Sequence, residues 1–302
     1  MSRQIEIVEV SARDGLQNEP GVFSTADKIE LIERSIAAGA RRIEVASFVH
    51  PGRVPQMADA EAVCVGLPKR DASEVTYIGL TLNKRGALRA LETQVHELGA
   101  VVSASDGFGT RNQGRTSDET LQDAIEIIRL AREHGRTAQA VISVAFGCPF
   151  DGEIAPERVA DLARRLAEAG PREIGIADTI GVAVPSQVRA VMAAVKKAAP
   201  GLPVRLHFHD TRNTAVANAW AGVEEGAETL DSSIGGIGGC PFAPKATGNV
   251  ATEDIQYMLQ RSGVETGLSL DGLIETAKWL GGRMNRDLPG LVSRAGGFPA
   301  SA

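Results

Sequence analysis

Two histidines placed two residues apart are the clearest candidates for chemistry in this sequence. They stand in residues 204–210 (VRLHFHD), which read as one short buried strand. Because successive side chains of a strand point to opposite faces, His207 and His209 point the same way. Two imidazoles on one face can hold one metal ion, whereas a single histidine in a strand is more often a hydrogen-bonded core residue.

A carboxylate ligand is expected from residues that follow the first predicted strand, where Arg13 and Asp14 are adjacent. Asp14 offers a hard oxygen, and a mixed set of imidazole and carboxylate suits Mg²⁺, Mn²⁺ or a similar first-row ion. Asn249 can add a neutral oxygen ligand, with capping of a helix that begins near Thr252 as the alternative. Arg13 stays protonated, so its chemistry is to hold a developing oxyanion.

Two further acidic residues stand at the ends of other predicted strands. Glu44 and Asp178 are expected to orient the metal ligands from behind. The alternative is a layer of salt bridges at one end of the fold, made by Arg13, Asp14, Glu44 and Asp178 without catalysis.

Cys240 is the most specific single candidate. It adjoins residues 235–239 (GGIGG) and precedes a proline. Glycines allow a mobile loop that closes over a substrate, and a thiol in that loop can act as an acid. The same glycines could instead bind phosphate, but their spacing is not that of a dinucleotide-binding fingerprint.

The elements that must position these residues are eight apolar segments, each followed by a helical pattern. The segments are residues 5–10, 42–47, 75–80, 100–104, 138–145, 173–177, 204–210 and 228–232. Apolar strands separated by helices predict a parallel sheet covered by helices, and eight such units predict a closed (β/α)8 TIM barrel. The alternative is an open doubly wound sheet. In a barrel the candidate residues gather at the C-terminal ends of the strands, where active sites lie.

One catalytic domain is expected over residues 1–302, with the barrel at about 4–265 and extra helices at about 266–290. The net charge of -6 and the lack of a Lys/Arg run argue against nucleic-acid and membrane partners. Three widely spaced cysteines do not indicate a disulfide framework. With no segment that reads as a signal peptide or a membrane span, a cytoplasmic location is expected.

Several segments together resemble the 3-hydroxy-3-methylglutaryl-CoA (HMG-CoA) lyase family of metal-dependent Claisen lyase and synthase barrels. They are residues 13–19 (RDGLQNE), 54–57 (VPQM), 207–211 (HFHDT), 235–241 (GGIGGCP) and 248–254 (GNVATED). The likeness extends from about residue 4 to about residue 287. It implies that the divalent cation, Mg²⁺ or Mn²⁺, is bound by Asp14, His207, His209 and Asn249.

The resemblance also implies a reaction, the cleavage of HMG-CoA to acetyl-CoA and acetoacetate. His207 would remove the hydroxyl proton, Arg13 would stabilise the enolate of acetyl-CoA, and Cys240 would supply a proton from the lid. Catalytic roles are expected for Glu44 and Asp178, and substrate contacts for Arg13, Gln17, Ser47 and Glu253. An acyl-CoA substrate, a homodimer and a place in leucine degradation complete what the family implies.

Three segments depart from the family pattern. Arg212, Asn213 and Thr214 stand where Tyr-Gly-Gln is usual, Asp106 replaces a glutamate, and residues 112–114 (NQG) are altered. Because these segments fall at the predicted mouth, the alternative is a lyase of the same mechanism that acts on a different 3-hydroxy-dicarboxylyl-CoA. A condensing synthase is disfavoured, because such enzymes typically read His-x-His-Asn-Asp. A non-enzymatic metal-binding barrel is disfavoured by the complete set of ligands with Arg13 and Cys240.

Overall fold

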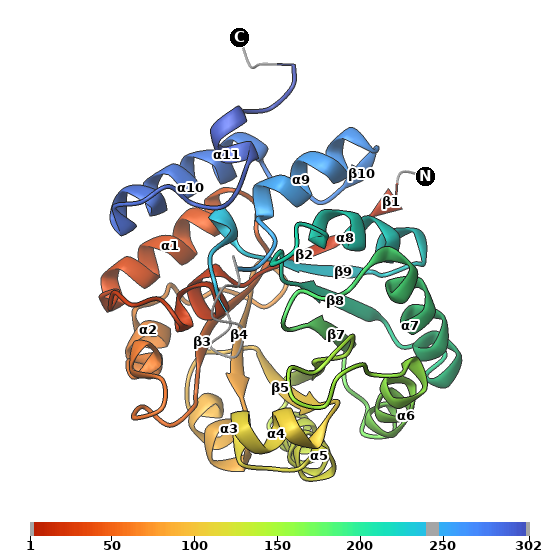
Figure 1. Cartoon of the computed structure of the whole chain (residues 1–302). Coiled ribbons are helices and arrows are strands. Elements are labelled where there is room, and N and C mark those ends of the chain that lie inside the picture. Colours follow the sequence, from red (N-terminus) through yellow and green to blue (C-terminus); the bar gives the residue numbers. More distant parts are fainter. Residues whose placement is uncertain (1–2, 240–247, 300–302) are drawn as a thin grey trace.

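Eight parallel strands close into a barrel at the centre of the molecule (Figure 1). This computed structural model describes residues 3–239 and 248–299. In barrel order the strands are β2 (Glu6–Glu9), β3 (Arg42–Ser47), β4 (Thr76–Thr81), β5 (Glu97–Ser103), β6 (Thr137–Ser143), β7 (Ile174–Asp178), β8 (Val204–Phe208) and β9 (Thr229–Ser232). The last strand pairs with the first, so the predicted TIM barrel is confirmed.

Helices surround the barrel on the outside (Figure 1). They are α1 (Thr25–Ala37), α2 (Ala60–Gly66), α3 (Lys84–Leu91), α4 (Asp106–Gln113), α5 (Ser117–Glu133), α6 (Pro156–Ala167), α7 (Pro185–Ala198), α8 (Ala215–Glu224) and α9 (Thr252–Arg261). Beyond the barrel, α10 (Leu270–Met284) lies beside α1, and α11 (Val292–Ala295) follows it. A two-stranded parallel sheet joins β1 (Arg3–Gln4) to β10 (Val264–Glu265).

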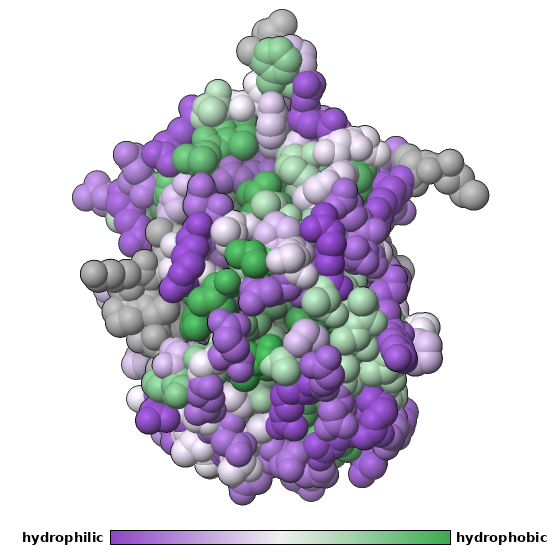
Figure 2. All heavy atoms as spheres, turned by 45° about the vertical axis from the view of Figure 1, so that its right-hand side comes forward, coloured by the Kyte–Doolittle hydropathy of each residue, from purple (hydrophilic) through white to green (hydrophobic). Residues whose placement is uncertain are grey.

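Apolar side chains fill the layer between strands and helices. Leu206 on β8, for example, is fully buried, and its side chain fills the space beside Gly222 on α8. A side chain at position 222 would collide with Leu206 there. Hydrophilic side chains cover most of the face in Figure 2, with apolar ones in smaller groups between them. No helix in residues 3–239 and 248–299 is long and apolar enough to cross a membrane.

The strand that carries the histidines ends earlier than predicted. β8 stops at Phe208, and the chain beyond it pairs with residues 248–250, although the N–H of His209 still reaches the carbonyl of Asp178 on β7 over 3.4 Å. Asp210 donates its backbone N–H to Gly248 over 2.9 Å, and His209 forms an antiparallel bridge with Asn249. The prediction of a strand through residue 210 was two residues too long, and the second histidine stands just past the strand end.

Two helical segments near the strand ends that bear on the site were not predicted. One is α4, and the other is the π-helical turn η1 (Ser11–Gly15), which follows β2 and carries Arg13 and Asp14. In this turn the N–H of Gly15 reaches the carbonyl of Val10, five residues back, over 3.1 Å. Such turns insert one extra residue into a helical path and are frequent at functional sites.

Charged residues occupy the interior of the barrel. Arg42 on β3 donates to Glu97 and Glu173 near the starts of the strands, and Arg205 on β8 donates to Glu44 on β3 over 2.9 Å. β3 and β8 are not neighbours, so the Arg205–Glu44 pair spans the barrel interior. Buried charges of this kind are tolerated only when they are paired and hydrogen-bonded.

We predict that Leu206→Ala lowers the free energy of unfolding by about 2–5 kcal/mol, because it leaves a cavity between β8 and α8. The measurement is urea unfolding followed by circular dichroism. Leu88→Ala is the matched control, since Leu88 is 40% exposed and should cost less than about 1 kcal/mol. Equal losses for the two variants would show that this interface is not closely packed.

Candidate metal centre and active site

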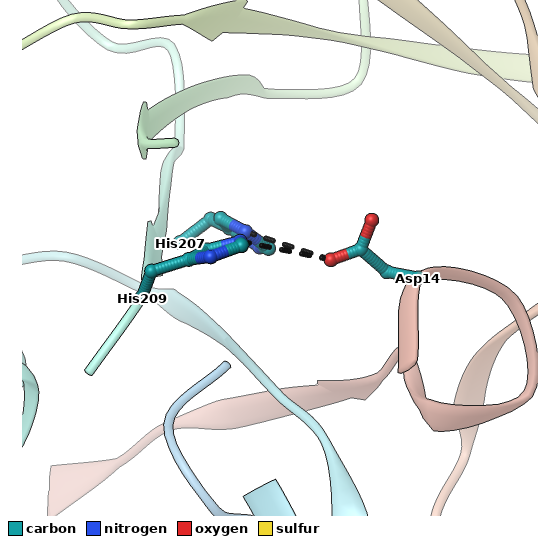
Figure 3. Close-up of side chains that lie close together, drawn as sticks. All are labelled: Asp14, His207 and His209. Carbon is teal, nitrogen blue, oxygen red and sulfur yellow. Dashed lines mark ion pairs between the residues drawn. The ribbon is translucent and has the colours of Figure 1, made fainter. Parts of the chain in front are cut away.

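The two histidines and Asp14 meet at the C-terminal end of the barrel. His207 comes from β8, His209 from the residue after its end, and Asp14 from η1. The Nε2 atom of each histidine lies 3.9 Å from Asp14 Oδ2, and one ligand atom from each residue falls within 4.8 Å of the others. Figure 3 shows both imidazole rings directed at the carboxylate. The structure thus brings together three residues that the sequence predicted as ligands.

Asn249 is the fourth predicted ligand, and it lies against the same carboxylate. Its Nδ2 donates to Asp14 Oδ2 over 2.9 Å and to the carbonyl of Ile237 over 3.1 Å. Its Oδ1 is buried and has no hydrogen-bond partner among the described residues. The alternative role as a helix cap is wrong, because the residue that precedes α9 is Ala251 and no side chain caps this helix.

These residues fit a divalent cation. Asn249 lies against the carboxylate that both imidazoles face, and its buried Oδ1 has no hydrogen-bond partner among the described residues. Buried polar atoms are normally hydrogen-bonded, so this oxygen is available as a ligand. Burial raises the pKa of Asp14, but Arg13 and the two histidines outweigh burial and hold that pKa well below its usual range. Burial, followed by the neighbouring His207, lowers the pKa of His209 to about 4, so His209 is neutral at pH 7 as a ligand must be.

Arg13 is held at this centre by two carboxylates. Its guanidinium pairs with Asp14, and its Nε donates to Glu44 Oε2 over 2.6 Å. Glu44 is 1% exposed, and its other oxygen accepts from Arg205. The predicted oxyanion-holding residue therefore lies directly beside the predicted ligands, and Glu44 lies behind Arg13 rather than behind a histidine.

The residue behind His207 is one that sequence reasoning missed. His207 Nδ1 lies 3.1 Å from Asp231 Oδ2, and Asp231 also pairs with Arg205. The available signal was the presence of charged residues in apolar strands, at Arg205 two positions before His207 and at Asp231 in the last strand.

The other predicted site residues stand at or beyond the C-terminal ends of their strands, Ser47 on β3, Asp178 on β7 and Gln17 after η1. Asp178 accepts from the backbone N–H groups of Val182 and Ala183 over 2.9 and 3.0 Å, and thereby anchors the loop after β7. Gln17 Oε1 and Ser47 Oγ are buried without a hydrogen-bond partner among the described residues.

Glu253 lies under the glycine-rich segment. It is fully buried, and its carboxylate accepts from the N–H of Gly235 in η3 (Ile234–Gly236) over 3.0 Å. Farther along, Gly239 accepts from the side chain of Asn18 over 2.8 Å. Cys240 lies outside the described residues, so its role stays a prediction from sequence.

Comparisons with known proteins agree with this geometry. A family model described as HMGL-like matches residues 4–280. The chain belongs to this family. HMG-CoA lyases are carbon–carbon lyases that in general depend on a divalent metal. The family match and the relatives of that name confirm the resemblance to HMG-CoA lyases.

Three relatives illustrate the family. The chain is 44% identical to an (R)-citramalyl-CoA lyase of Chloroflexus aurantiacus, over 97% of this chain and 95% of that protein. It is 39% identical to the hydroxymethylglutaryl-CoA lyase YngG of Bacillus subtilis, over 95% of each. A solved structure of an HMG-CoA lyase from Acinetobacter baumannii, in complex with coenzyme A and 3-methylmalate, superposes with a TM-score of 0.93 at 36% identity, covering 99% of this chain and 97% of that one.

We predict that Gly238→Ala weakens Mn²⁺ binding by roughly 10-fold or more. Gly238 has a φ of +114°, which an L side chain rarely adopts, and a methyl group there would collide with Asn249 Nδ2. Titration calorimetry measures the affinity. Gly21→Ala, where nothing lies within 4 Å of an added Cβ, is the control and should bind like the wild type. Unchanged binding by Gly238→Ala would exclude Asn249 from the metal centre.

We predict that Glu253→Gln flattens the pH dependence of stability. Burial raises the pKa of Glu253 from 4.5 to about 7, although its bond to Gly235 partly offsets the shift. The stabilising protonated form is fully present below the unfolded-state pKa and is lost as pH rises through the folded-state value. The wild type should therefore lose on the order of 3 kcal/mol relative to Glu253→Gln between about pH 5 and about pH 8. Denaturant unfolding at both pH values measures this, and parallel changes in the two proteins would contradict it.

Proposed function

We propose that this chain is a divalent-metal-dependent lyase that cleaves HMG-CoA to acetyl-CoA and acetoacetate. The observation that carries the proposal is the cluster of Asp14, His207 and His209 with Arg13 immediately beside it. This combination supplies a cation site and a fixed positive charge at one point, which a retro-Claisen cleavage needs. Mg²⁺ and Mn²⁺ are the proposed ions, because the donors are imidazole nitrogens and hard oxygens.

Asp14, His207, His209 and Asn249 would hold a divalent cation here, and its positive charge would make the tertiary hydroxyl of a bound substrate easier to deprotonate. His207 is the proposed base. Its Nδ1 faces Asp231, so Nε2 is the one ring nitrogen left to act. The roles of ligand and base that the family implies for His207 therefore use the same atom and cannot operate at the same moment.

Arg13 is proposed to hold the thioester oxygen as the carbon–carbon bond breaks. Negative charge moves onto that oxygen in the departing enolate, and a guanidinium already fixed by Asp14 and Glu44 needs little reorganisation to meet it. Cys240 is proposed to deliver the proton that converts the enolate carbon to the methyl group of acetyl-CoA.

A second candidate substrate is citramalyl-CoA, which lacks one methylene between the carbinol carbon and the carboxylate and would give acetyl-CoA and pyruvate. The relative from Chloroflexus aurantiacus, an (R)-citramalyl-CoA lyase, supports this alternative. So does Arg212, where the chain departs from the pattern usual in HMG-CoA lyases. Arg212 is exposed, and one of its guanidinium nitrogens donates to the carbonyls of Ile180 and Gly181. These bonds fix the guanidinium between the loops after β7 and β8.

The remaining proposals rest on the family resemblance. They are a homodimer and a role in leucine degradation. One catalytic domain over residues 1–302 and a cytoplasmic location are proposed from the sequence patterns instead. The acyl-CoA substrate has further support from the Acinetobacter baumannii enzyme, which was solved with coenzyme A.

We predict metal-dependent release of acetyl-CoA from HMG-CoA. The assay compares HMG-CoA and both enantiomers of citramalyl-CoA at equal concentration, with EDTA and with added Mg²⁺ or Mn²⁺. Release from HMG-CoA that is abolished by EDTA and restored by either ion would support the main proposal. Faster release from citramalyl-CoA, with pyruvate as the second product, would favour the second candidate, and no release from any of the three would contradict both.

A further inference from the structure

A buried arginine stands between the two halves of this site. Arg205 lies on β8 two residues before His207, so both side chains point into the barrel. The arginine is 1% exposed. Its Nε pairs with Asp231 on β9, and its Nη2 donates to Glu44 Oε1 on β3 over 2.9 Å. One guanidinium thus ties together two carboxylates from strands that are not neighbours, since β2 lies between β9 and β3.

The first of these carboxylates determines which nitrogen of His207 is free. Asp231 Oδ2 lies 3.1 Å from His207 Nδ1. A carboxylate can only accept a hydrogen bond, so Nδ1 must carry the hydrogen. In the neutral ring Nε2, which faces Asp14, is then bare and able to bind a cation or take a proton.

The second carboxylate determines where Arg13 stands. Glu44 Oε2 accepts from Arg13 Nε over 2.6 Å while Glu44 Oε1 accepts from Arg205. A continuous path of buried ion pairs and hydrogen bonds therefore runs from Arg13 through Glu44, Arg205 and Asp231 to His207. His207 and Arg13, which are proposed to act on neighbouring atoms of one substrate, are thus connected through the planar guanidinium of Arg205.

We propose that Asp231 is the positioning residue of His207 and that Arg205 holds Asp231 and Glu44 together, so that the bare Nε2 of His207 and the guanidinium of Arg13 are set in one fixed arrangement. The proposal rests on the proposed function for its catalytic meaning, but its structural content concerns the tautomer of His207 and the affinity for the cation. Neither residue is assigned contact with substrate.

The chemistry of arginine is what this role requires. Its flat fork donates in two directions at fixed angles, whereas a lysine ammonium is a single mobile point charge. Buried ion pairs are weak evidence for a role in stability, because well-packed apolar side chains can replace them without loss. A buried arginine whose carboxylate partners each lead to a functional residue is better explained by orientation of those residues.

The first test is Asp231→Asn, which keeps the shape but allows the amide to donate to Nδ1 and move the hydrogen to Nε2. Imidazole ¹⁵N spectra of histidine-labelled protein, at alkaline pH where the ring is neutral, report the tautomer directly. The chain has 5 histidines, so His207→Gln assigns the signal. We expect the Nδ1–H form in the wild type and its loss in Asp231→Asn, with Mn²⁺ affinity falling by roughly 10- to 100-fold.

Glu97→Gln is the matched control. Glu97 is fully buried in the same barrel, but it pairs with Arg42 and Arg172 near the starts of the strands, away from His207. This variant should leave the His207 tautomer and the Mn²⁺ affinity unchanged even if it lowers the melting temperature. A fall in Mn²⁺ affinity equal to that of Asp231→Asn would mean that general loss of stability explains the effect.

Arg205→Lys tests the link through arginine. If Arg205 acts on the cation through Asp231, the double variant Arg205→Lys/Asp231→Asn should bind Mn²⁺ no more weakly than Asp231→Asn alone. Fully additive losses would show that Arg205 does not act through Asp231.

The proposal is overturned if the wild-type His207 carries its hydrogen on Nε2, or if folded Asp231→Asn keeps the wild-type tautomer and Mn²⁺ affinity. If Asp231→Asn fails to fold, two other measurements test the proposal. They are the tautomer of His207 in the wild type and the Mn²⁺ affinity of Arg205→Lys, which should be weaker than that of the wild type. These readouts need no substrate. An enzyme that releases no acetyl-CoA but shows the expected tautomer and metal losses would refute the proposed function and leave the positioning roles standing.

Discussion

Charge buried inside the barrel must be matched by opposite charge, and the arrangement of the site depends on which carboxylates pair with the buried arginine. Arg205 is almost completely buried, and its guanidinium contacts Asp231 and Glu44 and lies 3.8 Å from Glu173. An unpaired charge there would cost several kcal/mol, so each partner is constrained to one place. Because Asp231 and Glu44 in turn contact His207 and Arg13, the pairing that satisfies the core also fixes the functional groups at its C-terminal end.

The charges and burial of the neighbouring residues also explain why a cation fits at the C-terminal end of the barrel. Asp14 remains ionised because Arg13 and the histidines favour its charged form, and His209 remains neutral because burial disfavours its charge. Asn249 contributes an oxygen with no protein partner among the described residues, on a segment that pairs with the chain just after β8. Gly238 permits this close approach, since a side chain at that position would displace Asn249.

Much of the fold could be predicted because strand and helix periods differ. The spacing of His207 and His209 predicted their common face, and β3 has the predicted limits. The partner of His207 could not be predicted, because it depends on the register of β8 against β9. That register pairs Leu206 with Leu230 and so sets His207 level with Asp231. Helix α4 was missed because its glycines and polar residues lack a helical pattern, and η1 because a π-helical turn has no sequence signature.

The most direct test of the account is anomalous diffraction from crystals grown with Mn²⁺ at the absorption edge of manganese. We predict one strong peak enclosed by Asp14, His209, the Nε2 side of His207 and Asn249 Oδ1, with ligand distances of about 2.0–2.3 Å. A peak elsewhere, or a site filled by water at a Mn²⁺ concentration that supports turnover, would show that these residues do not hold the cation on which the reaction depends.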